Sequence, residues 1–363
     1  MFQKIDKVLL AIILALLAFG FLIFVSASLG LLARDGASFQ SVAGRQLLAI
    51  ALGCGAAFGA LLFNYAKFKR YALLILIVSV FGALLVYIPQ IGLEHGGAKR
   101  WISVAGFSIQ PSEFLKLGLV IFAAAFMSAM KERIETIKWG LVPLLLLIAV
   151  AAAILLPQPD TDSFVVIAFT LLCMYIAAGG NKKHIAGVII LGVLVLSIYV
   201  ISKPYLIERF FTFLNPARDP QGSGWQIQQS LIAIGSGGFL GRGFGQSVQK
   251  FSYLPEPIDD SIFAVMSEEF GFVGSSTLVL LFLLFILRGL RNASRAPDLF
   301  GRLLCIGIVI LIGSGAFMNI AAMLGIIPLS GLPLPFVSHG GTALIAALFS
   351  AGILLSISRY QRS

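Results

Sequence analysis

The stretch from Tyr253 to Leu287, YLPEPIDDSIFAVMSEEFGFVGSSTLVLLFLLFIL, places a cluster of acids directly against a long apolar run. Five carboxylates fall within it, three before the run and two about two turns inside it: Glu256, Asp259, Asp260, Glu268 and Glu269. An unpaired carboxylate costs several kcal/mol in hydrocarbon. Acids at the mouth of a membrane helix therefore predict a polar cavity held open there, and this segment is the leading candidate site.

The composition of the whole chain indicates a membrane protein as well. A mean hydropathy of +0.99, with 59% hydrophobic and 12% charged residues, lies far outside the range of soluble domains. We predict an all-α, polytopic membrane protein that forms a single integral membrane domain over residues 1–363, with about ten transmembrane helices. The predicted spans are 8–32, 46–63, 71–90, 112–130, 140–157, 161–179, 184–202, 262–287, 303–327 and 335–357.

The distribution of Lys and Arg predicts the orientation, because positive residues in short loops stay cytoplasmic. With the N-terminus inside, 16 of the 26 basic residues lie in the cytoplasm, nine lie outside and one lies within a helix. Both termini are therefore expected in the cytoplasm. The net charge of +10 reflects this topology, and no nucleic-acid partner is expected.

A large extracytoplasmic loop, 203–261, is predicted between the seventh and eighth spans. Loops of this length are usually either functional or disordered. This one is too rich in aromatic and aliphatic residues for disorder, so we expect it to be functional. The apolar residues between Trp225 and Ile234 fall in a loose helical pattern, which suggests an amphipathic helix at the outer surface. The glycine-dense stretch 235–245, which carries Arg242, is either a phosphate-binding nest or, as we favour, a flexible re-entrant turn.

The fourth span begins with Gln110-Pro-Ser-Glu-Phe-Leu-Lys116, in which Pro111 suits the first turn of a helix. Glu113 and Lys116 are three residues apart and share a face of that helix. Ionisable groups inside a membrane are functional by default. The alternative is a self-neutralising structural pair, with Glu113 favoured by the helix N-terminal dipole.

The next outer turn, Gln158-Pro-Asp-Thr-Asp162, adds two carboxylates, at least one of which is expected to cap the sixth span. The outer face thus combines acids for proton transfer or metal binding with cations for anionic groups: Arg100, Arg209, Arg218, Arg242 and Lys116. No histidine pair has zinc-ligand spacing. A hard divalent cation held by carboxylates and substrate phosphates is the kind of metal that these residues allow. With apolar helices open to lipid, the set suits a substrate with an anionic head and a lipid tail.

Long motifs lie along the outer segments: Gly97-Ala-Lys-Arg-Trp-Ile102, Gln110-Pro-Ser-Glu-Phe-Leu-Lys116, Gln158-Pro-Asp160, Phe213-Leu-Asn-Pro216, Asp219-Pro-Gln-Gly-Ser-Gly-Trp225, residues 229–238, Leu254-Pro-Glu256, residues 319–325, and residues 331–338 with Gly340-Gly341. Together they resemble the SEDS family of peptidoglycan polymerases, typified by FtsW and RodA. The stretch 245–250, before Tyr253-Leu-Pro-Glu256, is more similar to FtsW than to RodA.

The resemblance implies an inverting glycosyltransferase that polymerises lipid II, an undecaprenyl-pyrophosphate-linked disaccharide, into glycan strands for cell division or shape. The family's catalytic aspartate, in a Leu-Pro-Glu-x-x-x-Asp-x-Ile-Phe-Ala pattern, corresponds to Asp260. It would act as the base on the acceptor hydroxyl, or would orient the acceptor or its metal. The residues implied in substrate binding are Glu113, Lys116, Arg209, Arg100, Gln158, Asp160 and Ser338.

Four positions depart from the family pattern: Asp259 stands for the usual Thr, Ser261 for Phe, Asp162 for Gly and His339 for Tyr. Asp259 puts a second acid beside the expected base. Neighbouring acids raise each other's pKa, so the way the pair shares a proton stays open.

The resemblance also implies the surroundings of the protein. We expect it in the bacterial cytoplasmic membrane, working at the outer face on lipid II and the growing glycan strand, among membrane lipids, with a class B penicillin-binding protein as partner. The expected cofactor is a divalent cation, Mg²⁺ or Mn²⁺, held by Asp260 with the substrate pyrophosphate.

Three other functions compete with polymerisation. A lipid II flippase would also need a lipid-facing polar groove, but a transporter's site lies near the midplane, whereas these acids cluster at the outer face. An ion-coupled transporter would need a mid-membrane acid beside a broken helix, and no span is predicted to carry one. A structural division scaffold would leave the Glu113–Lys116 pair unexplained.

Overall fold

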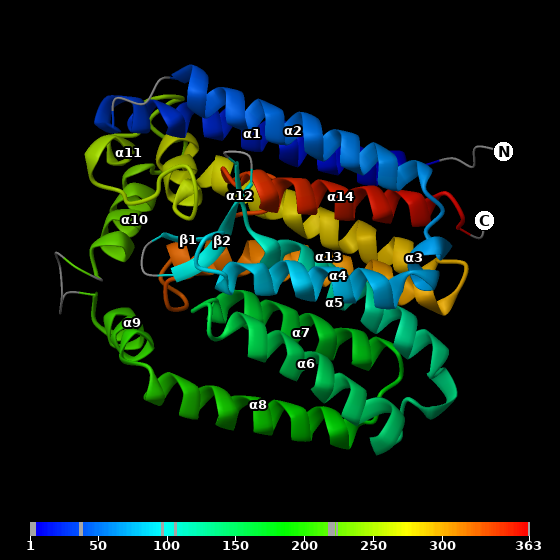
Figure 1. Ribbon diagram of the computed structural model, residues 1–363. Helices are drawn as coiled ribbons and strands as arrows, with labels where there is room; N and C mark the ends of the chain where they lie inside the picture. Colours follow the sequence, from blue (N-terminus) through cyan, green and yellow to red (C-terminus); the bar gives the residue numbers. More distant parts are fainter. Residues whose placement is uncertain are drawn as a thin grey trace.

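Apolar helices run side by side in a bundle, and the chain termini lie together at one end of it (Figure 1). The computed structural model describes residues 5–35, 39–95, 98–104, 107–216, 222 and 224–361. Arg218 and most of the 219–225 motif lie outside the described residues. The longer helices are α1 (Lys7–Asp35), α2 (Phe39–Leu62), α4 (Ala72–Leu84), α5 (Pro111–Ala129), α6 (Val142–Leu155), α7 (Thr161–Ala177), α8 (Lys182–Ser202), α12 (Ile262–Ser294), α13 (Leu299–Met323) and α14 (Gly341–Ser358).

Shorter elements connect these helices: α3 (Ala66–Arg70), a 3-10 turn (Leu85–Tyr87), a 3-10 turn (Lys131–Arg133), a π-helical turn (Ile137–Leu141), α9 (Pro204–Leu214), α10 (Trp225–Ser236) and α11 (Gln249–Ser252). Along the described chain, eight helices are long and apolar enough to cross a membrane, and two shorter apolar helices, 72–87 and 161–177, stand at the third and sixth predicted positions. The all-α membrane class is confirmed.

The last predicted span begins too early. The prediction placed its start at residue 335, but α14 begins at Gly341. Residues 335–340 form a loop in which Phe336 has a φ of 66°, a left-handed conformation that does not continue a helix. The prediction extended the span into this loop because the loop is apolar, and hydropathy does not predict backbone conformation.

A small antiparallel sheet stands towards the end of the bundle away from the termini (Figure 1) and was not predicted from the sequence. It contains β1 (Gly92–His95), β2 (Ala98–Val104) and β3 (Phe107–Ile109), in the order β1-β2-β3. Arg100 lies on the central strand, and its side chain contacts residues 158–160, just before the start of α7.

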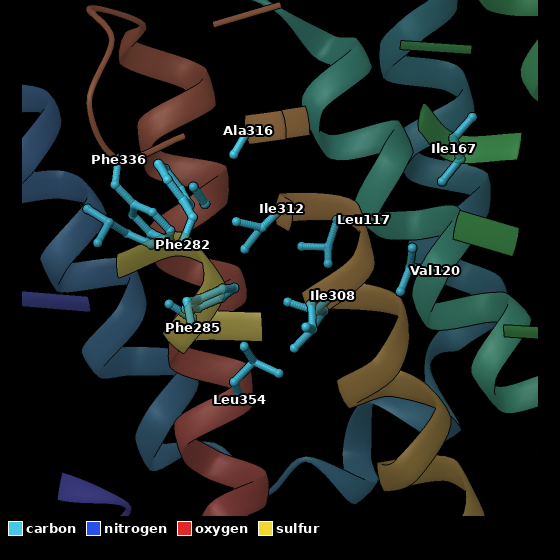
Figure 2. Packing of buried hydrophobic residues seen from close by; sticks show 14 of the residues in the cluster. Leu117, Val120, Ile167, Phe282, Phe285, Ile308, Ile312, Ala316, Phe336 and Leu354 are labelled. Atoms are coloured by element: carbon cyan, nitrogen blue, oxygen red, sulfur yellow. The ribbon is translucent and has the colours of Figure 1, made fainter. Parts of the chain in front are cut away.

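The core lies around α13, which packs against α5, α7 and α12. Figure 2 shows buried side chains from these helices meeting α14 and the loop before it. The labelled residues are Leu117, Val120, Ile167, Phe282, Phe285, Ile308, Ile312, Ala316, Phe336 and Leu354. By contrast α8 stands at the edge of the bundle (Figure 1) and buries none of its residues, so its apolar surface is left for lipid.

A break divides α12 near its start. Gly271 has φ 61° and ψ −159°, outside the helical region. The part after the break, residues 272–294, keeps enough length to span a membrane, since a span needs about 20 residues. Buried Glu268 and Glu269 lie just before it. Sequence analysis did not foresee two buried acids beside a helix break, although the break lies near the start of α12 and not at its middle.

The amphipathic helix expected near Trp225 is present as α10. It does not lie free on the surface, because Ile227, Ser230 and Ala233 are buried and the helix packs against α12 and α13. The preceding helix α9 follows α8 directly and was not predicted from the sequence. These two helices form one side of the site described next.

Candidate active site

Three polar contacts hold the loop that carries Asp260 in place before α12. The Ser338 hydroxyl donates to the carbonyl of Asp259 at 2.7 Å, and the His339 amide donates to the carbonyl of Ile258 at 2.8 Å. The buried Asn319 side chain on α13 donates to the carbonyl of Asp260 at 2.8 Å. Because all three bonds go to backbone carbonyls, the two carboxylates of the loop are left free for other contacts.

The same Asn319 amide also donates to the carbonyl of Leu332 at 2.8 Å. One buried side chain therefore joins the Asp260 loop to the 331–338 segment. Sequence reasoning placed Asn319 in a motif but gave it no role. Its signal was a polar residue in an apolar helix, which in membrane proteins requires a partner.

The carboxylate of Asp260 lines a cavity of about 300 Å³. The lining comes from α9, α10 and the loops before α12 and α14: Tyr205, Glu208, Arg209, Thr212, Phe213, Gln226, Ile227, Asp260, Leu329, Ser330 and Gly331. Gly331 lies between two charges, since a β-carbon there would be 3.6 Å from Asp260 Oδ2 and 3.6 Å from Arg100 Nη1. The absence of a side chain at this position leaves the space between them open.

Burial and neighbouring acids raise the pKa of Asp260 to about 7. Burial contributes most, and the negative charges of Glu256 and Asp162 add to it, while Arg100 and Arg209 act in the opposite direction. The pKa of Asp259 is also raised well above the usual value, by burial and then by Asp260 and Glu256. A carboxyl with a pKa of about 7 exchanges its proton near neutral pH, which suits a general base.

Two arginines approach this cavity from different elements. Arg209 on α9 lies 3.4 Å from Asp162 Oδ2, and that same oxygen accepts a hydrogen bond from the Gly331 amide at 3.0 Å. Arg100 on β2 donates to the carbonyls of Gln158 and Pro159. Arg209 is about one third exposed, so it can still meet an anionic group in the cavity.

Three of the predicted substrate-binding residues have structural contacts. Asp160 caps α7 by accepting from the Ser163 amide, as expected of one of the two acids, and lies 4.0 Å from the Arg100 guanidinium. Gln158 is buried and donates to the carbonyl of Ala83 at 3.1 Å. Ser338 is buried in the loop contacts described above. These contacts position the walls of the site, and substrate contact by the three residues stays a prediction.

The Glu113–Lys116 pair is formed at 2.8 Å on α5, and both side chains are nearly buried. It lines a second, smaller cavity of about 60 Å³, between α5, α7, α13 and α14. Residues 331–335 lie between the two cavities, with Gly331 lining the first and Leu332 and Pro333 the second. Glu113 and Lys116 therefore line a different cavity from Asp260 and Arg209.

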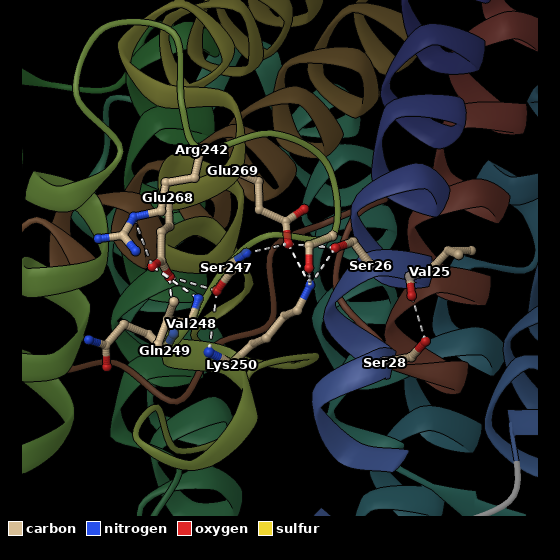
Figure 3. A network of polar contacts seen from close by, with 11 residues as sticks. Val25, Ser26, Ser28, Arg242, Ser247, Val248, Gln249, Lys250, Glu268 and Glu269 are labelled. Carbon is tan, nitrogen blue, oxygen red and sulfur yellow. Dashed lines mark hydrogen bonds and ion pairs between the residues drawn. The ribbon is translucent and has the colours of Figure 1, made fainter. Parts of the chain in front are cut away.

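The acids Glu268 and Glu269 do not hold a cavity open (Figure 3). The buried ammonium of Lys250 lies 2.6 Å from Glu269 Oε1 and donates to Ser26 Oγ at 2.8 Å. Glu268 accepts from the Ser247 hydroxyl at 2.6 Å and from the amides of residues 248 and 249. The pair instead fixes the 247–250 segment between α1 and α12.

The glycine-dense stretch 235–245 does not form a phosphate nest. The amides of Arg242 and Gly243 donate to the carbonyls of Glu268 and Glu269, at 3.0 Å each, so they are already used within the protein. The Arg242 guanidinium lies 3.5 Å from the Glu268 carboxylate. This stretch is a turn packed against the break in α12.

Sequence reasoning missed a polar group that belongs to the candidate site. Ser330 lines the Asp260 cavity, and its buried hydroxyl has no hydrogen-bond partner among the described residues. Such a group is a natural contact for a substrate hydroxyl or phosphate. No group of three or more His, Cys, Asp or Glu side chains that could hold a metal occurs in the described part of the chain.

Known proteins resemble this chain over nearly its whole length. A family described as "Cell cycle protein", FtsW/RodA/SpoVE, matches residues 7–363. Stage V sporulation protein E of Bacillus subtilis is 41% identical over 360 residues, covering 98% of both chains. A probable peptidoglycan glycosyltransferase FtsW of Trichlorobacter lovleyi is 39% identical over 356 residues, covering 97% of this chain and 93% of that protein.

Two solved structures share the fold. A chain from a peptidoglycan synthase complex, in work on the structural coordination of polymerization and crosslinking, has a TM-score of 0.81 and 28% identity, covering 99% of this chain and 98% of that one. The rod shape determining protein RodA of Thermus thermophilus has a TM-score of 0.73 and 25% identity, with the same coverage. The match to the family along residues 7–363, together with relatives near 40% identity, shows that this multi-pass membrane protein belongs to the FtsW/RodA/SpoVE family.

Proposed function

We propose that the protein is a peptidoglycan glycosyltransferase that polymerises lipid II into glycan strands at the outer face of the bacterial cytoplasmic membrane. One observation carries the proposal: Asp260, with a pKa of about 7, lines a polar cavity at the end of the bundle away from both termini. The relatives named as probable peptidoglycan glycosyltransferases support the reaction class.

Asp260 acts as the general base in this proposal. The acceptor's sugar hydroxyl attacks the anomeric carbon of the donor, its proton passes to the Asp260 carboxylate, and the bond from that carbon to the pyrophosphate oxygen breaks. One displacement converts an α-linked donor into a β-linked product, so a single base is sufficient. Arg209 then faces the negative charge that develops on the leaving pyrophosphate.

The carboxylates around Asp260 are enough to bind a divalent cation only if substrate phosphates supply further ligands. Mg²⁺ is often bound by one or two carboxylates plus substrate phosphates. Asp260 and Asp259 are adjacent acids, and Asp259 Oδ1 is buried without a hydrogen-bond partner among the described residues. We propose that these acids would hold Mg²⁺ or Mn²⁺ together with the substrate pyrophosphate, whose charge the ion would neutralise, while Asp260 accepts the proton of the acceptor hydroxyl.

Glu113 and Lys116 have a separate role in this proposal. Their cavity is lined by apolar side chains of four helices, α5, α7, α13 and α14, and by Pro333 and Pro335. It adjoins the Asp260 cavity through the 331–335 segment, so the pair supports that wall of the site. We retain substrate contact by Lys116 as a prediction, because an ammonium beside a lipid-facing cavity can meet a phosphate.

The surroundings of the enzyme follow from the same proposal. Both termini lie in the cytoplasm, as the distribution of basic residues predicts. A class B penicillin-binding protein is the proposed partner, supported by the similarity to a chain of a peptidoglycan synthase complex. FtsW and SpoVE relatives favour a role in division or sporulation over elongation.

A lipid II flippase is the second candidate, favoured by the cavity that Glu113 and Lys116 line between helices. One experiment separates the two. Purified protein is incubated with lipid II and Mn²⁺, and the products are resolved by length on a gel, in parallel with the Asp260→Asn variant. Glycan strands from the wild type alone support the polymerase. Lipid II movement across liposomes without strands, unchanged in the variant, would favour the flippase.

A further inference from the structure

The glycine-rich turn, residues 237–244, completes the broken helix α12. Positive φ at Gly271 takes the next amides away from their helical acceptors. Backbone hydrogen bonds between the turn and the helix replace the lost ones in both directions: Phe272 N to Gly238 O (2.9 Å), Val273 N to Phe239 O (3.1 Å), Arg242 N to Glu268 O (3.0 Å) and Gly243 N to Glu269 O (3.0 Å). Non-helical backbone is tolerated at membrane depth only when its polar groups are satisfied within the protein. The turn meets that condition at the break.

Three large side chains of the turn are apolar and uncovered, and its one charged side chain, Arg242, is paired with Glu268 at 3.5 Å. Leu240 is 76% exposed, Phe239 68% and Phe244 50%. Phe239 stacks on Phe272, the first residue after the break, with ring centroids 5.9 Å apart. Exposing this much phenylalanine and leucine surface to water is unfavourable in free energy, so these side chains require an apolar environment.

The position of the turn along the bundle follows from two helices. At the end that holds both termini, Arg288 of α12 is paired with Asp6 before α1, at 2.7 Å. Phe272 lies 16 residues from Arg288, which corresponds to about 24 Å along a helix. The hydrocarbon core of a membrane is about 30 Å thick. Phe272, and Phe239 stacked on it, therefore fall within the hydrocarbon or at its outer boundary.

The helix α1 gives an independent measure. Phe270 contacts Phe19 of α1 at 5.7 Å between ring centroids, and Phe244 contacts Phe270 at 6.4 Å. Phe19 lies 12 residues beyond Lys7, or about 18 Å along α1. Both helices thus place the aromatic residues of the turn at membrane depth.

An exposed apolar stripe on α12 continues from the turn towards the opposite end. Its residues recur at helical spacing: Val273, Leu280, Leu283, Leu284 and Leu287. In a membrane-spanning helix this face contacts lipid. The turn extends the same face, which favours acyl chains over a protein as the neighbour.

We propose that residues 237–244 form a re-entrant turn seated among the acyl chains of the outer leaflet, with Phe239, Leu240 and Phe244 in contact with lipid. The segment 203–261 is then not wholly extracytoplasmic. The same turn binds the backbone of Glu268 and Glu269, whose carboxylates hold residues 247–250. The lipid contact therefore helps to fix the start of the loop that leads to Asp260.

Fluorescence in lipid tests the proposal without any assay of activity. In a chain with Cys54, Cys173 and Cys305 replaced by alanine, a single cysteine is introduced as Leu240→Cys and labelled with NBD. Two matched controls are made in the same way. Leu284→Cys lies on the apolar stripe, and Lys99→Cys lies on β2, where the Lys99 side chain is about half exposed. Each labelled protein is reconstituted in phosphatidylglycerol vesicles with or without nitroxide-labelled lipid.

We expect the label at 240 to behave like the label at 284: a blue-shifted emission, strong quenching by the acyl-chain nitroxide and little quenching by aqueous iodide. The label at 99 should show the reverse. Iodide quenching at 240 equal to that at 99 would overturn the proposal. Protection from both quenchers would overturn it too, because it would mean that protein covers the turn.

Discussion

Two pairs of adjacent acids lie nine residues apart in this chain, and the structure treats them in opposite ways. Glu268 and Glu269 are buried among donors from Lys250, Ser26 and the 247–249 segment. Asp259 Oδ1 is buried without a hydrogen-bond partner among the described residues, and the pKa values of Asp259 and Asp260 are both raised. An acid that has its partners contributes to structure, whereas an acid kept without them is available for chemistry.

The largest expected effect is on catalysis by the unpaired pair. Asp260→Asn keeps the shape of the side chain but removes the base, so lipid II polymerisation should fall by about 10²–10⁴-fold, the range for a general base. Thermal stability at pH 8 should stay equal or rise. The rate is measured by strand synthesis on gels. A variant that keeps more than a third of the wild-type rate would remove Asp260 from the mechanism.

Breaking the paired acids should instead unfold the protein more easily. Lys250→Met leaves Glu269 buried without its cation, which should cost about 3–5 kcal/mol of stability. The double variant with Glu269→Gln should cost less than the sum of the single changes, because the two side chains interact directly. Melting in detergent, followed by intrinsic fluorescence, measures each step. If the stability losses of the two single variants simply add in the double variant, the Lys250–Glu269 contact does not contribute to stability.

Removing the link between α13 and the Asp260 loop should have an intermediate effect. Asn319→Asp replaces the amide donor by an acceptor facing two carbonyls, and we expect a loss of about 1–3 kcal/mol in stability. The maximum rate should fall while KM for lipid II changes little, because Asn319 positions Asp260 and does not line its cavity. Asn319→Gln, which keeps the donor, is the matched control. A change confined to KM would argue for direct substrate contact.

The smallest effect is a shift of the pH profile. Asp260 must be deprotonated to accept a proton, so the rate should rise with pH through about 7 and level off above it. Glu256→Gln removes a negative charge that raises this pKa and should move the midpoint to lower pH. Arg209→Gln removes a positive charge and should move it to higher pH. Profiles of initial rate between pH 5 and pH 9, kept at constant ionic strength, should distinguish the three proteins; coincident midpoints would contradict the assignment.

The raised pKa also predicts the sign of the pH effect on stability. A folded-state pKa near 7, above the usual 3.8, means that the folded protein binds this proton more tightly than the unfolded chain does. Stability should therefore decrease as pH rises from about 4 to 7 and then stay level. Asp260→Asn should abolish that part of the decrease, and a comparison of melting temperatures at pH 5 and pH 8 tests this. An identical dependence in the variant would mean that other groups cause it.

Much of the architecture follows from local sequence properties. Apolar runs of spanning length predicted the helices, Pro111 marked the start of α5, and Asp160 the cap of α7. These signals work because each depends on residues within one or two turns of chain. The family motifs identified Asp260, just before the start of α12, as the candidate catalytic residue.

What the sequence could not reveal depends on residues that are distant along the chain. Adjacent acids look alike in sequence, and only folding brings Ser26 to Glu269, 243 residues away, while leaving Asp260 in a cavity formed by α9, α10 and the loop before α14. The break in α12 likewise depends on the turn that supplies its missing hydrogen bonds. Hydropathy predicts which segments are buried, but partners for buried charge are set by tertiary contacts, because a charge is satisfied only by groups that the fold brings within hydrogen-bond distance.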